Sequence, residues 1–159
     1  MLDPAFRADA RLLILGSWPG AQSLREGRYY ANPGNRFWPV MERLTGRELV
    51  PLSYENRLEQ LKDAGVALWD SLASAERQGS LDSAIRNAVP NNIAILTGTL
   101  PELRAIGCNG ALSWRYALKG AYGETVPLLR LPSTSAANAA LRLDDLAAAW
   151  SENLAPYLA

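Results

Sequence analysis

The chain has 159 residues, and its sixteen basic and sixteen acidic side chains give a formal net charge of zero. This length suits one domain over residues 1–159 with a buried core, and the balanced charge excludes a global positive field that would drive tight non-specific binding to duplex nucleic acid. One cysteine and no histidine exclude a disulfide framework, a four-cysteine metal or iron–sulfur site and a histidine base, so no metal and no cofactor are expected.

Four apolar runs typical of strands recur along the chain, with amphipathic stretches between them. They are Leu12–Leu15, Val66–Trp69, Arg104–Cys108 and Val126–Leu131. Strands that alternate with helices favour a parallel sheet covered on both faces. The expected fold class is therefore α/β, with three layers in an α/β/α arrangement around a central four-stranded, mainly parallel sheet.

Helices are expected between and after these runs. The first begins at Asn35, has apolar side chains at i, i+4 and i+7, and ends at Gly46, a residue type that commonly terminates helices. The others are expected around Tyr54–Leu61, directly after Asp82, around Ile93–Leu96, over Leu112–Leu118, and over the stripe of Leu143, Leu146, Trp150 and Leu154.

The first strand ends in a glycine-flanked loop, Gly16-Ser17-Trp18-Pro19-Gly20. Open α/β sheets bind ligands beyond the carboxyl ends of their strands, so the backbone N–H groups of this loop are expected in the binding crevice. The long segment from residue 26 to residue 34 carries two tyrosines and is expected to form one wall of that crevice. Carboxamides at Asn32 and Asn35 can pair with base edges and aromatic faces stack on bases, so the mixture favours a flipped nucleobase.

Several ordered segments carry a family resemblance. The main ones are the loop 16–20, Tyr29-Tyr30-Ala31-Asn32-Pro33-Gly34-Asn35-Arg36-Phe37-Trp38 and Leu131-Pro132-Ser133-Thr134-Ser135, and between them come Leu68-Trp69-Asp70, Gly79-Ser80-Leu81-Asp82 and Asn109-Gly110. This set resembles the uracil-DNA glycosylase superfamily, and most closely its hypoxanthine-DNA glycosylase (deoxyinosine glycosylase) branch. The resemblance implies that family's fold and a DNA repair enzyme. Such an enzyme hydrolyses the N-glycosidic bond of a deaminated base and leaves an abasic site, with hypoxanthine expected first and uracil or xanthine as alternatives.

By this resemblance, Asn35 is the expected catalytic residue, which would orient the attacking water or bond the departing base. Several branches carry a polar catalytic residue at the position held here by Trp18, whose indole cannot position water. The hypoxanthine branch places that work on the asparagine that matches Asn35. Asparagine is also a preferred residue at the start of a helix, so capping is a second explanation of Asn35 and is compatible with the first.

Two groups of residues near the first strand are expected to bind the base. Backbone N–H groups of Gly16, Ser17 and Trp18 would stabilise the departing base as an anion. By resemblance, Tyr30 would stack on the extruded base. The plainer alternative is that the tyrosines at 29 and 30 pin their loop to the domain.

Four more residues complete the expected base pocket. By resemblance, Asn109 reads the base edge and Gly110 leaves room for it, although Asn-Gly is also a common turn pair. Asp70 would point into the crevice, or would serve as a helix cap or loop ion pair. Asn32 stands where the family usually has histidine, and it would either hold the loop through a local hydrogen bond or change which base is accepted.

The last strand is followed by a hydroxyl-rich segment. By resemblance this loop binds DNA through Ser133, Thr134, Ser135 and Ala136: it grips phosphates, with Ser133 and Ser135 as the phosphate ligands, and it enters the minor groove. Its other interpretation is a cap for the final helix. Ala136 and Ala137 are small for a wedge between bases, which favours already destabilised pairs or single strands as substrate.

Four cations, Arg25, Arg28, Arg36 and Lys119, are expected to form a local positive rim beside the site. The N-terminal residues show no basic and apolar leader, and no segment approaches membrane-spanning length. We therefore expect a soluble, cytoplasmic monomer whose partner is DNA. The competing hypothesis is a non-catalytic nucleobase- or nucleotide-binding α/β domain, although the chain lacks the GxGxxG and GxxxxGK[ST] phosphate loops.

Overall fold

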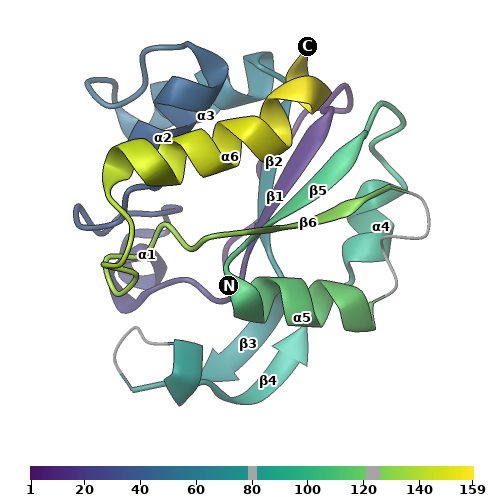
Figure 1. Cartoon of the computed structure of the whole chain (residues 1–159). Helices are drawn as coiled ribbons and strands as arrows, with labels where there is room; N and C mark the ends of the chain where they lie inside the picture. Colours follow the sequence, from purple (N-terminus) through teal and green to yellow (C-terminus); the bar gives the residue numbers. More distant parts are fainter. Residues whose placement is uncertain (79–81, 121–125) are drawn as a thin grey trace.

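A computed structural model gives the fold of residues 1–78, 82–120 and 126–159 (Figure 1). At its centre lies a four-stranded sheet in the order β2-β1-β5-β6, in which every neighbouring pair is parallel. The strands are β1 (Leu12–Gly16), β2 (Val66–Asp70), β5 (Ala105–Asn109) and β6 (Leu128–Leu131). They coincide with the four predicted apolar runs, and the predicted α/β class is confirmed.

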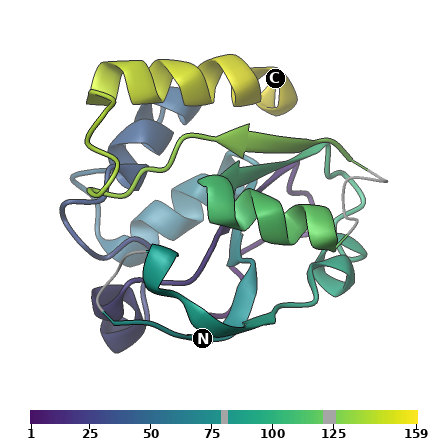
Figure 2. The same cartoon turned by 60° about the horizontal axis from the view of Figure 1, so that its bottom comes forward.

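Helices cover both faces of this sheet (Figures 1 and 2). One face carries α2 (Phe37–Thr45), α3 (Tyr54–Asp63) and α6 (Leu143–Leu158), and the other carries α4 (Ile93–Thr97) and α5 (Ala111–Lys119). The central strand β1 shows why both faces are apolar. Because successive side chains of a strand point to opposite faces, Leu12 and Ile14 join the core under α2 and α6, whereas Leu13 and Leu15 join the core under α4.

The predicted helix ends agree with the structure where a local signal fixes them. Gly46 follows α2 with a φ of 70°, a left-handed conformation that glycine adopts at little cost, and its N–H bonds the Glu42 carbonyl. The Ser53 side chain accepts a hydrogen bond from the N–H of Asn56 and so caps α3. These helix boundaries follow from the local sequence.

Two predictions about the connecting segments are wrong or incomplete. No long helix follows Asp82: a three-residue 3-10 turn (η1, Asp82–Ala84) leads into β4 (Arg86–Pro90), which pairs antiparallel with β3 (Leu72–Glu76) in a second, two-stranded sheet. The partner strand supplies the backbone hydrogen bonds that a helix would otherwise have made, and Pro90 cannot extend a helix. A short helix, α1 (Ala21–Glu26), was not predicted. Residues 79–81 of one family motif lie outside the described residues.

The parallel sheet brings the site together. Because all four strands run in one direction, their carboxyl ends lie at the same edge, and Gly16 is in register with Asp70 there. On the other side of β1, Asn109 of β5 is in register with Leu131 of β6. Within the described part of the chain, no helix is long and apolar enough to cross a membrane.

Candidate functional site

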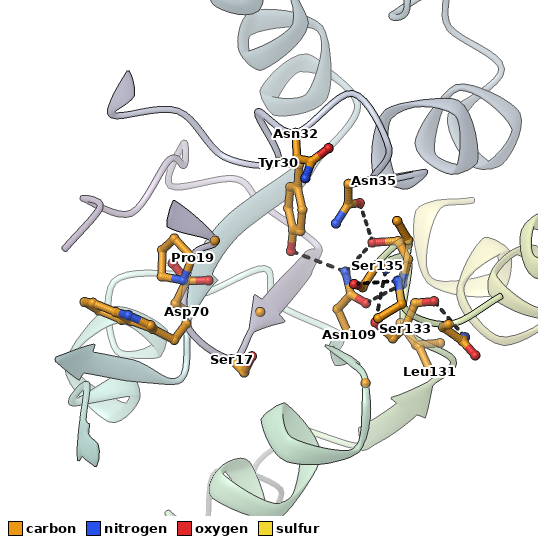
Figure 3. Close-up of a pocket in the computed structure, with 18 of the residues that line it drawn as sticks. Ser17, Pro19, Tyr30, Asn32, Asn35, Asp70, Asn109, Leu131, Ser133 and Ser135 are labelled. Atoms are coloured by element: carbon orange, nitrogen blue, oxygen red, sulfur yellow. Dashed lines mark hydrogen bonds between the residues drawn. The ribbon is translucent and has the colours of Figure 1, made fainter. Parts of the chain in front are cut away.

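A cavity of about 900 Å³ opens at the carboxyl edge of the sheet (Figure 3). Its size lies in the range typical of small-molecule sites. Every residue proposed from the sequence lines it: Gly16, Ser17, Trp18, Tyr30, Asn32, Asn35, Asp70, Asn109, Gly110, Ser133, Thr134, Ser135 and Ala136. Five separate segments of the chain therefore meet at one place, and part of the long segment 26–34 forms a wall as predicted.

Gly16 allows a carboxylate to lie against the backbone of β1. A Cβ atom at residue 16 would lie 2.5 Å from Oδ1 of Asp70 and 3.2 Å from the hydroxyl oxygen of Tyr30. Asp70 is buried, with 5% of its surface exposed, and its side chain lines the cavity. The glycine is required here by this close approach, and it places a carboxylate and a phenol side by side at the cavity wall.

The two adjacent tyrosines have different roles. Tyr29 is buried, and its hydroxyl donates to the carbonyl of Asp3 at 2.6 Å. Burial, and after it the charge of Asp70, raise the pKa of the Tyr29 phenol far above its usual range, so the phenol remains a donor. The N–H of Tyr29 donates to the hydroxyl of Tyr54 at 2.9 Å. Tyr29 is thus the residue that pins the loop.

Tyr30 instead presents its ring to the cavity. Its backbone has a φ of 54°, a left-handed conformation that is uncommon for a residue with a side chain. One face of its ring stacks on Phe37, with centroids 3.9 Å apart and an interplanar angle of 21°. Its hydroxyl accepts a hydrogen bond from Nδ2 of Asn109 at 3.4 Å. Strained backbone of this kind persists where surrounding contacts hold it, commonly at functional sites.

Asn35 joins α2 to the loop that follows β6. Its Oδ1 accepts the N–H of Phe37 at 3.0 Å. The expected cap at Asn35 is nevertheless wrong, because α2 begins at Phe37 and Arg36 holds the cap position without a side-chain cap bond, so Asn35 closes a local turn in front of the helix. The same oxygen accepts the hydroxyl of Thr134 at 2.8 Å (Figure 3). Asn109 bonds Thr134 twice, through Oδ1 to the Thr134 N–H at 3.0 Å and through Nδ2 to the hydroxyl at 3.0 Å. Thr134 is therefore the hub of the polar side of the cavity.

The loop after β6 divides into a buried and an exposed part. Thr134 has no exposed surface. Its side chain therefore lies inside the protein and not on the DNA-facing surface where the sequence predicted it. Ser133 and Ser135 are half-buried, and Ala136 is exposed. The hydroxyls of both serines accept N–H groups within the loop, from Ser135 and Ala137. The segment does not cap α6, which starts only at residue 143 and has no side-chain cap.

The predicted positive rim is mostly wrong. None of the four predicted cations is among the described residues that line the cavity. Arg36 is turned inward and donates to the carbonyls of Asn138 and Leu141 at 2.6 and 2.5 Å, so it clamps the loop before α6. Lys119 lies at the far end of α5 from the cavity, over the ring of Tyr116. The loop position of Arg36 could not predict its inward orientation, because the carbonyls that bind its guanidinium are more than a hundred residues away in the sequence.

Sequence reasoning missed two arginines at the site. Arg130 of β6 lines the cavity, and its guanidinium lies 5.4 Å from the centroid of the Trp114 ring. Arg77 follows β3 and donates to the carbonyls of Trp18 and Pro19, so the second sheet supports the loop after β1. A charged residue within the apolar run of the last strand was the signal available for Arg130. No local signal pointed to Arg77.

Asn32 makes the local hydrogen bond that was one of its two expected roles. Its Oδ1 accepts the N–H of Gly34 at 2.8 Å, which closes a tight turn in the loop. Asn32 is exposed and lines the cavity near Tyr30 (Figure 3). The hydrogen bond explains how asparagine keeps the loop closed where the family usually has histidine.

Comparison with known proteins gives consistent matches. The chain matches the Uracil DNA glycosylase superfamily over residues 4–153. It is 36% identical over 127 residues to the Hypoxanthine DNA glycosylase of Methanosarcina barkeri (strain Fusaro / DSM 804), which covers 80% of this chain and 75% of that protein. It is 39% identical over 138 residues to the Hypoxanthine DNA glycosylase of Methanosarcina acetivorans, which covers 82% of each.

Among solved structures, the chain is similar to the solution NMR structure of a candidate uracil DNA glycosylase from Methanosarcina acetivorans. The TM-score is 0.87 at 31% sequence identity, and the match covers 98% of this chain and 96% of that one. The overall fold is therefore shared with that structure over nearly the whole of both chains.

Proposed function

The chain belongs to the uracil DNA glycosylase superfamily, and we propose that it is a DNA repair glycosylase that removes a deaminated base from DNA. The observation that supports this most is that the motif residues, which come from five separate segments, line one cavity at the carboxyl edge of the sheet. Two relatives named Hypoxanthine DNA glycosylase support hypoxanthine in deoxyinosine as the base, with uracil and xanthine as alternatives. The family match over residues 4–153 supports one domain over residues 1–159.

The reaction is hydrolysis of the bond between C1′ of the deoxyribose and a ring nitrogen of the base. That bond breaks, the base leaves with the bonding electron pair, and the oxygen of a water molecule bonds to C1′. That water loses one proton, and the released base gains one at its ring nitrogen. The transition state carries positive charge on the sugar and negative charge on the base. Hydrogen-bond donors near the base and a carboxylate near the sugar lower its free energy more than that of the substrate.

We assign these roles to the residues that line the cavity. Asn35 bonds the departing base or orients the attacking water, and residues 16–18, which line the same cavity, offer their backbone N–H groups as further donors. Asp70, the buried carboxylate of the wall, stabilises the positive sugar. Because Phe37 covers one face of the Tyr30 ring, the extruded base stacks on the other face, a contact typically worth about 1–3 kcal/mol per base.

Asn109 and Gly110 form the wall against which the base edge lies. Asn109 is buried and bonded to Thr134, so only its long 3.4 Å bond to the Tyr30 hydroxyl is weak enough for a base to replace. Gly110, with a φ of 96°, holds a conformation that side-chain-bearing residues rarely adopt. Recognition of the base then depends on a rigid wall rather than on a freely rotating amide.

The loop after β6 and the neighbouring arginine contact the DNA backbone. Ser133 and Ser135 present half-buried hydroxyls at the cavity rim, Ala136 is exposed, and Arg130 supplies a positive charge beside them. Hydroxyls, backbone N–H groups and arginine are the usual ligands of phosphate oxygens. These groups position the strand while the base enters the cavity.

The decisive experiment uses labelled oligonucleotides that carry one hypoxanthine, one uracil or one xanthine, followed by alkaline cleavage of abasic sites. We expect cleavage at hypoxanthine, and a decrease of about 10²–10³-fold in Asn35→Ala. The matched control is Asn92→Ala: the Asn92 side chain caps α4 by accepting the N–H of Ile95, but it does not line the cavity. Preferential cleavage at uracil would show that uracil, and not hypoxanthine, is the preferred substrate. Absence of cleavage in all three oligonucleotides would favour the hypothesis of a non-catalytic binding domain.

We also propose that the enzyme acts as a cytoplasmic monomer. The cavity is lined by residues of one chain, so a single copy can form the whole site, which supports the monomer. Light scattering coupled to size-exclusion chromatography would give the mass in solution. A mass of twice the 17.3 kDa of one chain would overturn the monomer.

A further inference from the structure

Two backbone N–H groups fix the direction of every hydrogen bond between Asn109, Thr134 and Asn35. A backbone N–H can only donate. The atom of Asn109 that faces the Thr134 N–H must therefore be its oxygen, which turns Nδ2 of Asn109 toward the Thr134 hydroxyl. Because that hydroxyl accepts from Nδ2, its own proton is available to Asn35.

The same argument fixes Asn35 independently. The N–H of Phe37 requires an oxygen opposite it, so the atom at 3.0 Å is Oδ1 of Asn35. The hydroxyl of Thr134 donates to that same oxygen at 2.8 Å. The amide assignment of Asn35 thus follows from one obligatory donor, the Phe37 N–H, and does not depend on the near-equal shapes of oxygen and nitrogen. Because that oxygen can only accept, the Thr134 hydroxyl must be the donor to it.

The NH₂ group of Asn35 consequently faces the cavity. Its oxygen has both lone-pair positions occupied, and Nδ2 has no acceptor among the residues that the structure describes. In Figure 3 this nitrogen points into the space beside Tyr30. A group presented in this way donates hydrogen bonds, but it cannot accept a proton from water.

We infer that Thr134 is a positioning residue that orients the amide of Asn35, and that Asn35 therefore assists the departing base as a hydrogen-bond donor and does not accept from the attacking water. The inference rests on the proposed function, which leaves two roles open for Asn35. Of these two roles, the inference selects that of hydrogen-bond donor to the base. Thr134 is fully buried, so it acts through Asn35 and makes no contact with DNA through its side chain.

The first test is Thr134→Val, which keeps the shape of the side chain and removes the hydroxyl. We expect the single-turnover rate to fall by about 10–100-fold, a part of what loss of a transition-state donor costs, with unchanged affinity for DNA that carries a non-cleavable abasic analogue. Thr134→Ser restores the hydroxyl and should restore most of the rate. The matched control is Thr45→Val. The Thr45 hydroxyl also donates one bond and accepts one, but it lies outside the cavity.

A double-mutant cycle separates positioning from a general loss of stability. If Thr134 acts through Asn35, then Thr134→Val lowers the rate in the wild-type background and has no further effect in Asn35→Ala. Equal effects in both backgrounds, or a Thr134→Val rate equal to that of Thr45→Val, would overturn the inference.

The donor role has its own test in Asn35→Asp. The aspartate keeps an oxygen opposite Phe37 and Thr134 but presents a second acceptor to the cavity in place of the NH₂ group. We expect it to be as slow as Asn35→Ala, whereas retention of the wild-type rate would show that Asn35 works as an acceptor for water.

A measurement without substrate distinguishes failure of the inference from failure of the proposed function. The Asn35 side-chain NH₂ signal in a ¹⁵N-correlated NMR spectrum is assigned by its loss in Asn35→Ala. We expect it to shift in Thr134→Val and to stay in place in Thr45→Val. If the wild type cleaves no damaged base but the signal shifts, the proposed function fails and the positioning role stands; an unmoved signal overturns the positioning role.

Discussion

Replacement of Gly16 by alanine is expected to slow catalysis strongly while the protein remains folded. A Cβ atom at residue 16 would lie 2.5 Å from Oδ1 of Asp70, whereas ordinary contacts begin at 3.4 Å, so the carboxylate must move by about 0.9 Å (3.4 minus 2.5). The Tyr30 hydroxyl, at 3.2 Å, must move slightly as well. A misplacement of about 1 Å in an active site can lower a rate by about 10²-fold, while overpacking costs about 1–3 kcal/mol of stability.

The assay is single-turnover release of hypoxanthine, measured beside thermal unfolding of the same samples. Gly107→Ala in β5 is the matched control, because a Cβ there meets apolar side chains of the core, with Ile14 Cδ1 and Leu131 Cδ1 both at 3.0 Å. We expect Gly107→Ala to lose stability and to keep its rate well below the melting temperature. A wild-type rate in Gly16→Ala would refute the argument that the position of Asp70 sets the geometry of the site.

Three further predictions concern stability and reactivity. Arg36→Ala removes a guanidinium that donates to two loop carbonyls. It should lower the free energy of unfolding in denaturant by about 1–3 kcal/mol and raise the amide hydrogen-exchange rates of residues 133–141. Unchanged exchange rates would contradict the role of Arg36 in holding this loop. The N–H groups of Leu49 and Val50 donate to the carboxylate of Glu42 and lower its pKa. The free energy of unfolding of the wild type should therefore exceed that of Glu42→Gln by about 1 kcal/mol at neutral pH. This difference in stability is fully present above the unfolded-state pKa of about 4.3 and is lost as pH falls through the lowered pKa of the folded state. A difference that does not change with pH would show that ionisation of Glu42 is not its cause. Burial raises the pKa of Cys108 to about 12, so a thiol reagent at pH 8 should label it only on unfolding, and rapid labelling of folded protein would refute its burial.

The strands and the location of the site were predictable from the sequence because their causes are local. The runs of β1, β2 and β5 are apolar because both faces of these parallel strands are buried, and the five residues of β1 are buried without exception. Once strands and helices alternate, the carboxyl ends must meet at one edge, and the loops that follow them must meet there too. That is why motif residues as distant as Asn35 and Thr134 could be expected in one cavity.

The second sheet could not be predicted, because its stability depends on a partner. The exposed strand β4 has no apolar pattern of its own, and it exists through pairing with β3. Short segments of this kind take their conformation from tertiary contacts that override local propensity. The same holds for Arg36, whose bonds reach carbonyls more than a hundred residues away.

The sequence by itself determined the fold class, the family and the set of residues that meet at the cavity. Only the tertiary structure decided what each of them does there. Thr134 was expected on the DNA, but the approach of β5 and α2 buries its hydroxyl between Asn109 and Asn35. Which atom of an amide faces a cavity depends on donors brought in from other segments, and no local pattern of residues encodes that direction.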